Sequence, residues 1–181
     1  MSDFQKIEYY DLGLEAQENR IPKLVGRAEE MDRLTRIVSK SGRNNCMLVG
    51  ASGTGKTILF HGWAKRARSL FSIVRMEAES FYGLHQAPPL VFARYQEAFS
   101  GLPSCVLFID SFGSLVHNKP AIFQQMVRLL NPVLKRPDVK VVLAFLPHEL
   151  TWMEHEDPSF AQFFERIALK QQGADEQADI L

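Results

Sequence analysis

Apolar residues recur along the chain at two spacings, one typical of helices and one typical of buried strands. Helical spacing is clearest at Met31, Leu34 and Ile37, which fall three residues apart. Acidic residues open this stretch and Gly42 follows it, as expected at the two ends of a helix. Pro88 or Pro89 near the first turn favours a helix over residues 88–102 in the same way. The predicted helices cover residues 26–42, 56–70, 88–102, 120–136 and 158–166, with a kink expected at Pro132.

Short apolar runs such as "CMLV" and "CVLFID" lie between these helices. Uninterrupted runs of this length are typical of strands that are buried on both faces of a parallel sheet. The predicted strands cover residues 46–49, 72–78, 104–110, 139–146 and 166–170. Because strands alternate with helices, the sequence predicts an α/β domain with a mainly parallel sheet covered on both faces.

The two ends of the chain lack these patterns. Residues 1–25 are polar with scattered aromatic residues, and we expect them to wrap the outside of the domain. From residue 171 onward the chain is rich in charged residues, glutamine and alanine, and no packed element is predicted there. The length of 181 residues fits one domain, because domains commonly have about 100–200 residues.

Composition and charge exclude several function classes. Lys and Arg together number 21, as do Asp and Glu, so the chain carries no net charge that would favour nucleic acid. Neither a signal peptide nor an apolar run long enough for a membrane span is present, which favours a cytoplasmic protein. Cys46 and Cys105 lie inside apolar runs and are expected to be buried thiols of the core.

The stretch "GASGTGKT", residues 50–57, carries the clearest chemical signal. It fits the phosphate-loop pattern G-x-x-x-x-G-K-[ST], and it lies between a predicted strand and a predicted helix, as that pattern requires. Glycines let backbone N–H groups turn toward phosphates, and the helix N-terminus adds partial positive charge. We expect Lys56 to reach the β- and γ-phosphates and the Thr57 hydroxyl to ligate Mg²⁺. The predicted nucleotide-binding residues of this loop are Gly50, Gly53, Thr54, Gly55, Lys56 and Thr57.

Asp110 ends the apolar run "CVLFID". At this position, downstream of a phosphate loop, an aspartate is expected to hold Mg²⁺ as the second metal-side acid. The alternative is that a strand-terminal aspartate only caps a turn. With Thr57, Asp110 makes up the predicted metal site.

Four stretches together carry a family resemblance. They are "YDLGLEAQENRIPKLVGR", "RNNCMLVGASGTGKT", "RLLNPVLKRPDVKVVLAF" and "GADEQADIL". In this order they resemble the large subdomain of the first ATPase ring of ClpA/ClpB-type chaperones, within the AAA+ superfamily. The resemblance runs from about residue 10 to the last residue.

The resemblance implies a fold and a division of the chain. The fold would be a three-layer α/β/α sandwich whose five-stranded parallel sheet has the order 5-1-4-3-2, with ATP or ADP and Mg²⁺ at its carboxyl edge. Residues 1–23 would be a lead-in segment and residues 24–170 the nucleotide-binding subdomain. Residues 171–181 would begin a helical lid or a tail, and the sequence leaves open whether Leu181 is a natural end.

The resemblance also assigns roles to two further segments. Val25, Gly26 and Arg27, with Leu24 before them, occupy the adenine-contacting segment of the family; the alternative is an apolar turn packed on the core. The stretch "SFYG", which contains Phe81 and Tyr82, lies where the family has a loop that grips polypeptide substrate. Since the surrounding motif is absent, an ordinary aromatic surface loop is an equal alternative.

Three departures from the family affect positions used for hydrolysis. Ser111 stands where the family has a glutamate that activates water, and a serine hydroxyl at neutral pH is no substitute for a carboxylate base. The apolar Phe145 and Leu146 stand at its polar sensor. Gln162 and Phe163 stand at the paired arginines that serve a neighbouring subunit.

Some residues could replace the missing groups. Arg166 is close enough in sequence to serve as an arginine finger, although Glu165 beside it offers a simpler ion-pair role. Glu149 and Glu154 follow the fourth strand, and either could supply a substitute base.

The sequence thus supports three functional hypotheses. The first is an ATP-binding Clp-type AAA+ module in which hydrolysis is impaired. The second is an active ATPase subunit of a protein-unfolding or disaggregating ring, with self or Clp-type subunits as partners and polypeptide bound through the Tyr82 loop. The third is an adaptor or regulator of such a ring. Neither the substrate nor the oligomeric state can be derived from the sequence.

Overall fold

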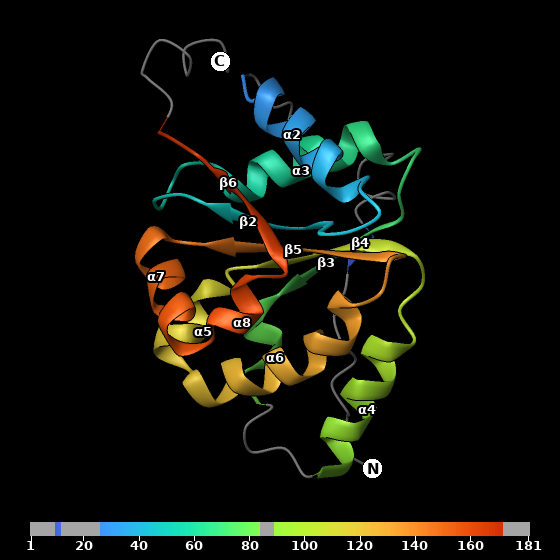
Figure 1. Ribbon diagram of the computed structural model, residues 1–181, viewed down its shortest axis with the longest axis vertical. Coiled ribbons are helices and arrows are strands. Elements are labelled where there is room, and N and C mark those ends of the chain that lie inside the picture. Colours follow the sequence, from blue (N-terminus) through green and yellow to red (C-terminus); the bar gives the residue numbers. More distant parts are fainter. Residues whose placement is uncertain (1–9, 12–25, 84–88, 172–181) are drawn as a thin grey trace.

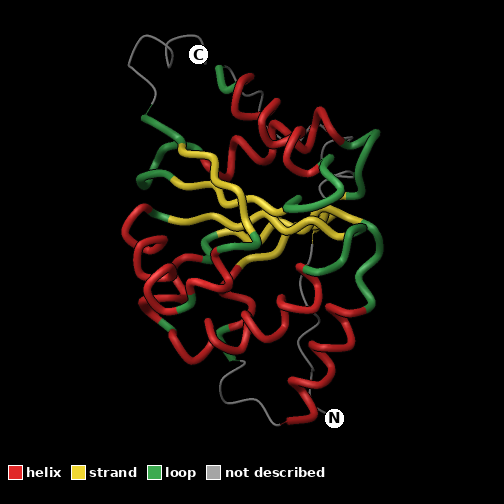
Figure 2. Tube along the Cα trace, in the orientation of Figure 1, coloured by secondary structure: helices red, strands yellow, loops and turns green. Residues whose placement is uncertain are grey.

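A central sheet separates two layers of helices in this computed structural model (Figure 1). The structure describes residues 10–11, 26–83 and 89–171. Figure 2 shows the strands as one twisted layer with helices on both sides. The three-layer α/β/α architecture predicted from the sequence is therefore confirmed.

The sheet has six strands in the order β1-β3-β4-β5-β2-β6. The last five are parallel, and read from β6 they have the predicted order 5-1-4-3-2. The first is an edge strand of two residues that pairs antiparallel with β3, which the polar lead-in sequence did not indicate. The strands are β1 (Tyr10–Asp11), β2 (Asn45–Val49), β3 (Ile73–Glu77), β4 (Cys105–Asp110), β5 (Val139–Phe145) and β6 (Phe164–Ala168).

Helices α2 (Ala28–Val38) and α3 (Lys56–Ala67) cover one face of the sheet (Figure 1). The other face is covered by the remaining helices of the described chain, and a short 3₁₀ turn, η1 (Ala78–Phe81), follows β3. Within the described residues no helix is long and apolar enough to cross a membrane. The helices of the second face are α4 (Pro89–Ser100), α5 (Gly113–Asn118), α6 (Pro120–Leu134), α7 (Pro147–Glu156) and α8 (Pro158–Ala161).

Each face of the sheet has its own apolar core. Below α2 and α3 the rings of Phe60 and Phe108 stack with centroids 4.1 Å apart, and Trp63 packs beside them. The opposite core is built around Phe112, whose ring meets Phe145 edge-on at 5.8 Å. Aromatic pairs in these geometries add about 0.5–1.5 kcal/mol each beyond the area that they bury.

The two cysteines are buried free thiols, as predicted. Burial raises the pKa of Cys105 to about 11 and also raises the pKa of Cys46. Because the reactive species is the thiolate, both groups behave as small core residues at neutral pH.

The helix expected over residues 158–166 is wrong beyond Ala161. Strand β6 begins at Phe164, where it pairs with the start of β2. The aromatic run in this stretch imitates helical spacing, but Phe164 and Ile167 bury their side chains in the cores on opposite faces of the sheet. Tertiary pairing therefore overrides the local pattern. Two short helices, α5 and α7, were not predicted, and α5 begins with Gly113, a poor helix former.

Candidate functional site

The loop between β2 and α3 has the backbone conformation that a phosphate cradle needs. Gly53 and Gly55 adopt left-handed φ angles of 76° and 82°, which favour glycine. At Gly50 an added Cβ would lie 2.5 Å from Thr54 Oγ1 and 2.9 Å from the carbonyl oxygen of Leu169. No larger side chain fits at Gly50 without movement of the loop.

Lys56 opens α3 and folds its side chain back over the loop. Its Nζ donates hydrogen bonds to the carbonyl oxygens of Gly50, at 2.7 Å, and Ala51, at 3.0 Å. Burial lowers the pKa of Lys56, and the carboxylates of Glu149 and Asp110 oppose this shift. The ammonium group is thus held where the loop, α3 and two acidic side chains meet.

Asp110 ends β4 directly opposite Thr57, the second residue of α3. The Thr57 hydroxyl donates a hydrogen bond of 2.7 Å to Asp110 Oδ2, and the Ser111 N–H donates one of 2.9 Å to Oδ1. Only 6% of Asp110 is exposed. A hydroxyl and a carboxylate oxygen side by side are the donors that Mg²⁺ prefers beside phosphates, so the two residues fit such an ion.

These groups line one cleft at the carboxyl edge of the sheet. Its volume is about 460 Å³, and its walls come from the glycine loop, the start of α3, the end of β4, the end of β5 and α7. Ligands of open α/β sheets bind in this position, outside the carboxyl ends of the strands. The structure therefore brings Lys56, Thr57 and Asp110 together as the sequence predicts.

Arg27 connects the loop with the end of β6. Its Nη2 donates to the carbonyl oxygens of Thr54, at 3.0 Å, and Lys170, at 2.6 Å, while Nη1 pairs with Glu30 at 2.8 Å. Gly26 and Arg27 both have positive φ angles, of 80° and 83°. Val25, the other residue predicted to contact adenine, lies outside the described residues, as does Leu24. A role in binding adenine stays a prediction.

Three of the positions that are predicted to depart from the family pattern, Ser111, Phe145 and Leu146, line the same cleft. Ser111 is exposed, has a positive φ angle of 54° and lines the cleft beside Asp110. The ring of Phe145 is fully buried in the core, and the half-buried Leu146 offers the cleft only an apolar side chain. At these three positions the residues of the cleft are a serine with its hydroxyl and two apolar residues.

Two acidic residues, Asp110 and Glu149, line the cleft. The sequence indicates a role in the site less clearly for Glu149 than for Asp110. Only 8% of Glu149 is exposed, and its Oε2 accepts a hydrogen bond of 2.7 Å from the backbone N–H of Leu146. It is the third residue of α7, after Pro147, a position from which glutamate often reaches back to the helix start. That capping pattern was the available signal, but it predicts a helix start and not a cleft residue.

The predicted finger positions, Gln162 and Phe163, do not line this cleft. Gln162 is exposed and Phe163 is half-buried. Arg166 forms an ion pair with Glu154, so its guanidinium is engaged within the chain. A second cavity of about 520 Å³ includes Gln162 and Arg166 in its wall, together with Arg33 and Arg43.

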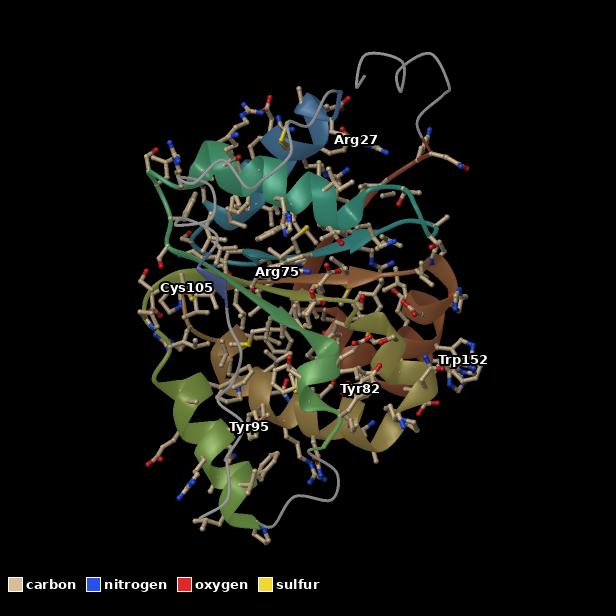
Figure 3. All side chains as sticks on the ribbon, turned by 180° about the vertical axis from the view of Figure 1, so that it is seen from behind. Arg27, Arg75, Tyr82, Tyr95, Cys105 and Trp152 are labelled. Atoms are coloured by element: carbon tan, nitrogen blue, oxygen red, sulfur yellow. The ribbon has the colours of Figure 1, made fainter. Side chains whose placement is uncertain are left out.

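The aromatic pair of "SFYG" is divided between core and surface. Phe81 is fully buried, whereas Tyr82 is half-buried (Figure 3). The Tyr82 ring packs against the core between the sheet and helices α4 to α8, and Lys119 Nζ lies 5.7 Å from its centroid. Residues 84–88, which would complete a substrate-gripping loop, lie outside the described residues. Phe81 is therefore a core residue, and the substrate role of Tyr82 stays a prediction.

Curated relatives resemble the chain over nearly its whole length. The chaperone protein ClpB of Mycoplasma pneumoniae is 24% identical over 194 residues, which span 99% of this chain and 27% of the relative. ClpB of Agrobacterium fabrum is 26% identical over 184 residues, covering 94% of this chain and 21% of the relative. The chain thus spans about a quarter of the length of these relatives.

Solved structures show the same fold. A closed-state structure of Hsp104 with ATPγS and FITC casein has a TM-score of 0.80 at 21% identity, over 96% of this chain and 31% of that chain. The complex of Hsp104 from S. cerevisiae with ADP has a TM-score of 0.79 at 21% identity, over 95% of this chain and 26% of that chain.

The family model for the ATPase family associated with various cellular activities (AAA) matches residues 46–156. This range is more than half of the chain and includes the glycine loop, Asp110 and the end of β5. The resemblance to the ClpB type is confirmed by the relatives above. The chain belongs to the ATPase family associated with various cellular activities (AAA), and over nearly its whole length it is similar to a part of the ClpB chaperones.

Proposed function

We propose that this chain binds ATP or ADP with Mg²⁺ in the cleft between the glycine loop and Asp110, and that it hydrolyses ATP poorly. Nucleotide binding is what membership of the AAA family implies. Binding is further supported by Lys56, Thr57 and Asp110, which lie together at the N-terminus of α3. Within this proposal Mg²⁺ is held by Thr57 and Asp110, and its charge offsets that of the phosphates.

The observation that carries the second half of the proposal is Ser111. It lines the cleft next to Asp110, where the resembled family has its water-activating glutamate. General-base assistance is worth about 10²–10⁴ in rate, and a neutral hydroxyl does not supply it. The apolar Phe145 and Leu146 at the sensor positions, and Gln162 and Phe163 at the finger positions, point in the same direction. The effects of such losses on the rate are not additive, so the individual factors cannot be multiplied. We therefore expect only that turnover is slow.

Phosphate release under saturating Mg-ATP tests this proposal. The wild-type chain should turn over well below about 1 s⁻¹, the lower end of ordinary enzyme rates. Lys56→Ala, which removes the cation of the loop, is the matched control for contaminating ATPases. Turnover of about 1 s⁻¹ or more that disappears in Lys56→Ala would show that the chain is a working ATPase.

A second candidate function is ATP hydrolysis with Glu149 as the base. It is favoured by one observation, which is that the Glu149 carboxylate lines the cleft and lies close enough to Lys56 to oppose the lowering of its pKa. Against it, Oε2 is held by the N–H of Leu146. Glu149→Gln keeps the shape of the side chain and removes the base. A rate that falls at least about a hundredfold in this variant would favour the second candidate.

The partners that we propose follow from the relatives. Hsp104 has been solved with casein and ATPγS, and this chain covers 31% of that protein. We propose that the chain associates with itself or with a Clp-type ring, either as a subunit that contacts polypeptide near Tyr82 or as an adaptor of the ring. Light scattering after gel filtration, with and without ATP, separates these roles. A subunit should form larger assemblies with ATP, whereas an adaptor should stay monomeric until a Clp-type partner is added.

A further inference from the structure

Both carboxylate oxygens of Asp110 are already bound by donors of the chain itself. Oδ1 accepts from the Ser111 N–H at 2.9 Å, and Oδ2 accepts from the Thr57 hydroxyl at 2.7 Å. In addition, Nη2 of Arg75 lies 3.3 Å from the same Oδ2 and forms an ion pair with it. The acid that is expected to serve the metal therefore has a permanent cation beside it.

The register of the sheet brings this arginine to Asp110. Strands β3 and β4 are parallel, with Arg75 opposite Phe108 and Glu77 opposite Asp110. Because side chains two residues apart on a strand share a face, these four side chains lie on the face covered by α2 and α3. Phe108 is fully buried there under α3. The guanidinium of Arg75 is confined between this apolar core and two carboxylates, since Nη2 also pairs with Glu77.

The surroundings make the contact persistent. The side chain of Arg75 is 18% exposed and that of Asp110 is 9% exposed, and partly buried charge pairs are screened by salt less than exposed ones. Guanidinium stays protonated throughout the physiological pH range. Burial raises the pKa of Glu77, a rise that Arg75 opposes, so the same arginine acts on both acids. Figure 3 shows Arg75 in the sheet layer, between the two layers of helices.

We propose that Arg75 is a built-in cation at the metal-side acid and makes the binding of nucleoside triphosphate by this chain largely independent of Mg²⁺. The inference rests on the proposed nucleotide binding and extends it to the metal requirement: Thr57 and Asp110 can hold Mg²⁺, but the ion adds little to the affinity for nucleotide because Arg75 already faces the same carboxylate. A divalent ion near Asp110 would be attracted by the carboxylate, but Arg75 already neutralises part of that negative charge. The positive guanidinium would also repel the ion. In the described part of the chain Arg75 does not line the cleft, so it is a positioning residue that acts through Asp110.

Equilibrium binding of ATP, measured by calorimetry in excess Mg²⁺ and in EDTA, tests the proposal without any readout of hydrolysis. For the wild-type chain the two dissociation constants should agree within about threefold. In Arg75→Met the ratio should rise to about tenfold or more, because one charge contact in a partly buried site is worth at least that factor. Arg75→Lys, which keeps a charge but not the fork of donors, should fall between the two.

The matched control is Arg66→Met, on the exposed side of α3, where Arg66 pairs with Asp32 at 3.2 Å. Its ratio should equal that of the wild type. A wild-type ratio of about tenfold or more overturns the proposal by itself, also if Arg75→Met does not fold. An unchanged ratio in folded Arg75→Met overturns it as well. Absence of ATP binding in both buffers would instead refute the proposed function, and this inference with it.

Discussion

At the scale of single residues, the cleft depends on one close approach between α5 and α7. Gly113, the first residue of α5, is buried against the Glu149 side chain. A Cβ built at Gly113 would lie 2.2 Å from Glu149 Oε2 and 2.7 Å from Phe145 Cδ1. Glu149 holds the start of α7 through Leu146, so any group added at Gly113 pushes on the wall of the cleft.

Gly113→Ala should therefore destabilise the protein by about 1–3 kcal/mol, the usual cost of overpacking a core. Helix propensity alone predicts the opposite, since alanine in a helix is favoured over glycine by about 0.5–1 kcal/mol. Urea unfolding measures the difference in free energy. Gly42→Ala is the control, because its Cβ would meet nothing within 4 Å, and we expect a change within about 0.5 kcal/mol. If Gly113→Ala and Gly42→Ala had equal free energies of unfolding, the close approach of Gly113 to Glu149 would be contradicted.

At the scale of elements, a buried asparagine ties together the strands that carry the cleft. Asn45 begins β2, is 2% exposed, and accepts a hydrogen bond of 2.8 Å from the N–H of Val141 in β5. It also pairs with Phe164 of β6 in the parallel register. The side chain thus satisfies a backbone donor of the neighbouring strand at the edge opposite the cleft. Asn45 thus aligns β2 and β5 at the ends opposite the cleft.

Asn45→Ala should lower the free energy of unfolding by about 1–3 kcal/mol, because it leaves the buried N–H of Val141 without its acceptor. Native-state hydrogen exchange should show faster exchange at Val141 as well. Asn44→Ala is the neighbouring control, since Asn44 is similarly buried but its contact with the Pro137 carbonyl is long, at 3.4 Å. A cost for Asn44→Ala as large as that for Asn45→Ala would show that burial, and not the hydrogen bond, sets the effect.

The elements also show why the sequence predicts some parts of the fold better than others. The parallel strands are buried on both faces, so their apolar runs stand out, and the loop from Gly50 to Thr57 is a local motif. Strand β6 was partly mistaken for a helix because its pairing with β2 involves residues far apart in the chain. Glu149 could be proposed from its place after the fourth strand, whereas Arg75 reaches Asp110 only through the register of the sheet. No local spacing signals such contacts.

At the scale of the whole molecule, the cleft lies where the two cores meet across the sheet. The glycine loop leads into α3 on one face of the sheet, whereas Glu149 lines the cleft from α7, a helix of the other face. Arg27 adds a connection from the loop, through Thr54, to Lys170 at the end of β6. A ligand in the cleft therefore contacts or adjoins elements of all three layers. Binding there is expected to stabilise the molecule as one unit.

ATP at 100 times its dissociation constant should raise the free energy of unfolding by about 2.7 kcal/mol, since a ligand that binds only the folded state stabilises it by mass action. For a chain of this size that corresponds to an increase in melting temperature of about 5–10 °C. Differential scanning calorimetry, with each variant compared with its own nucleotide-free form, provides the measurement. Lys56→Ala should show no increase, whereas Arg66→Met should match the wild type. An equal increase in Lys56→Ala would place the nucleotide away from the glycine loop, because that variant removes the ammonium group that donates to the carbonyl oxygens of Gly50 and Ala51.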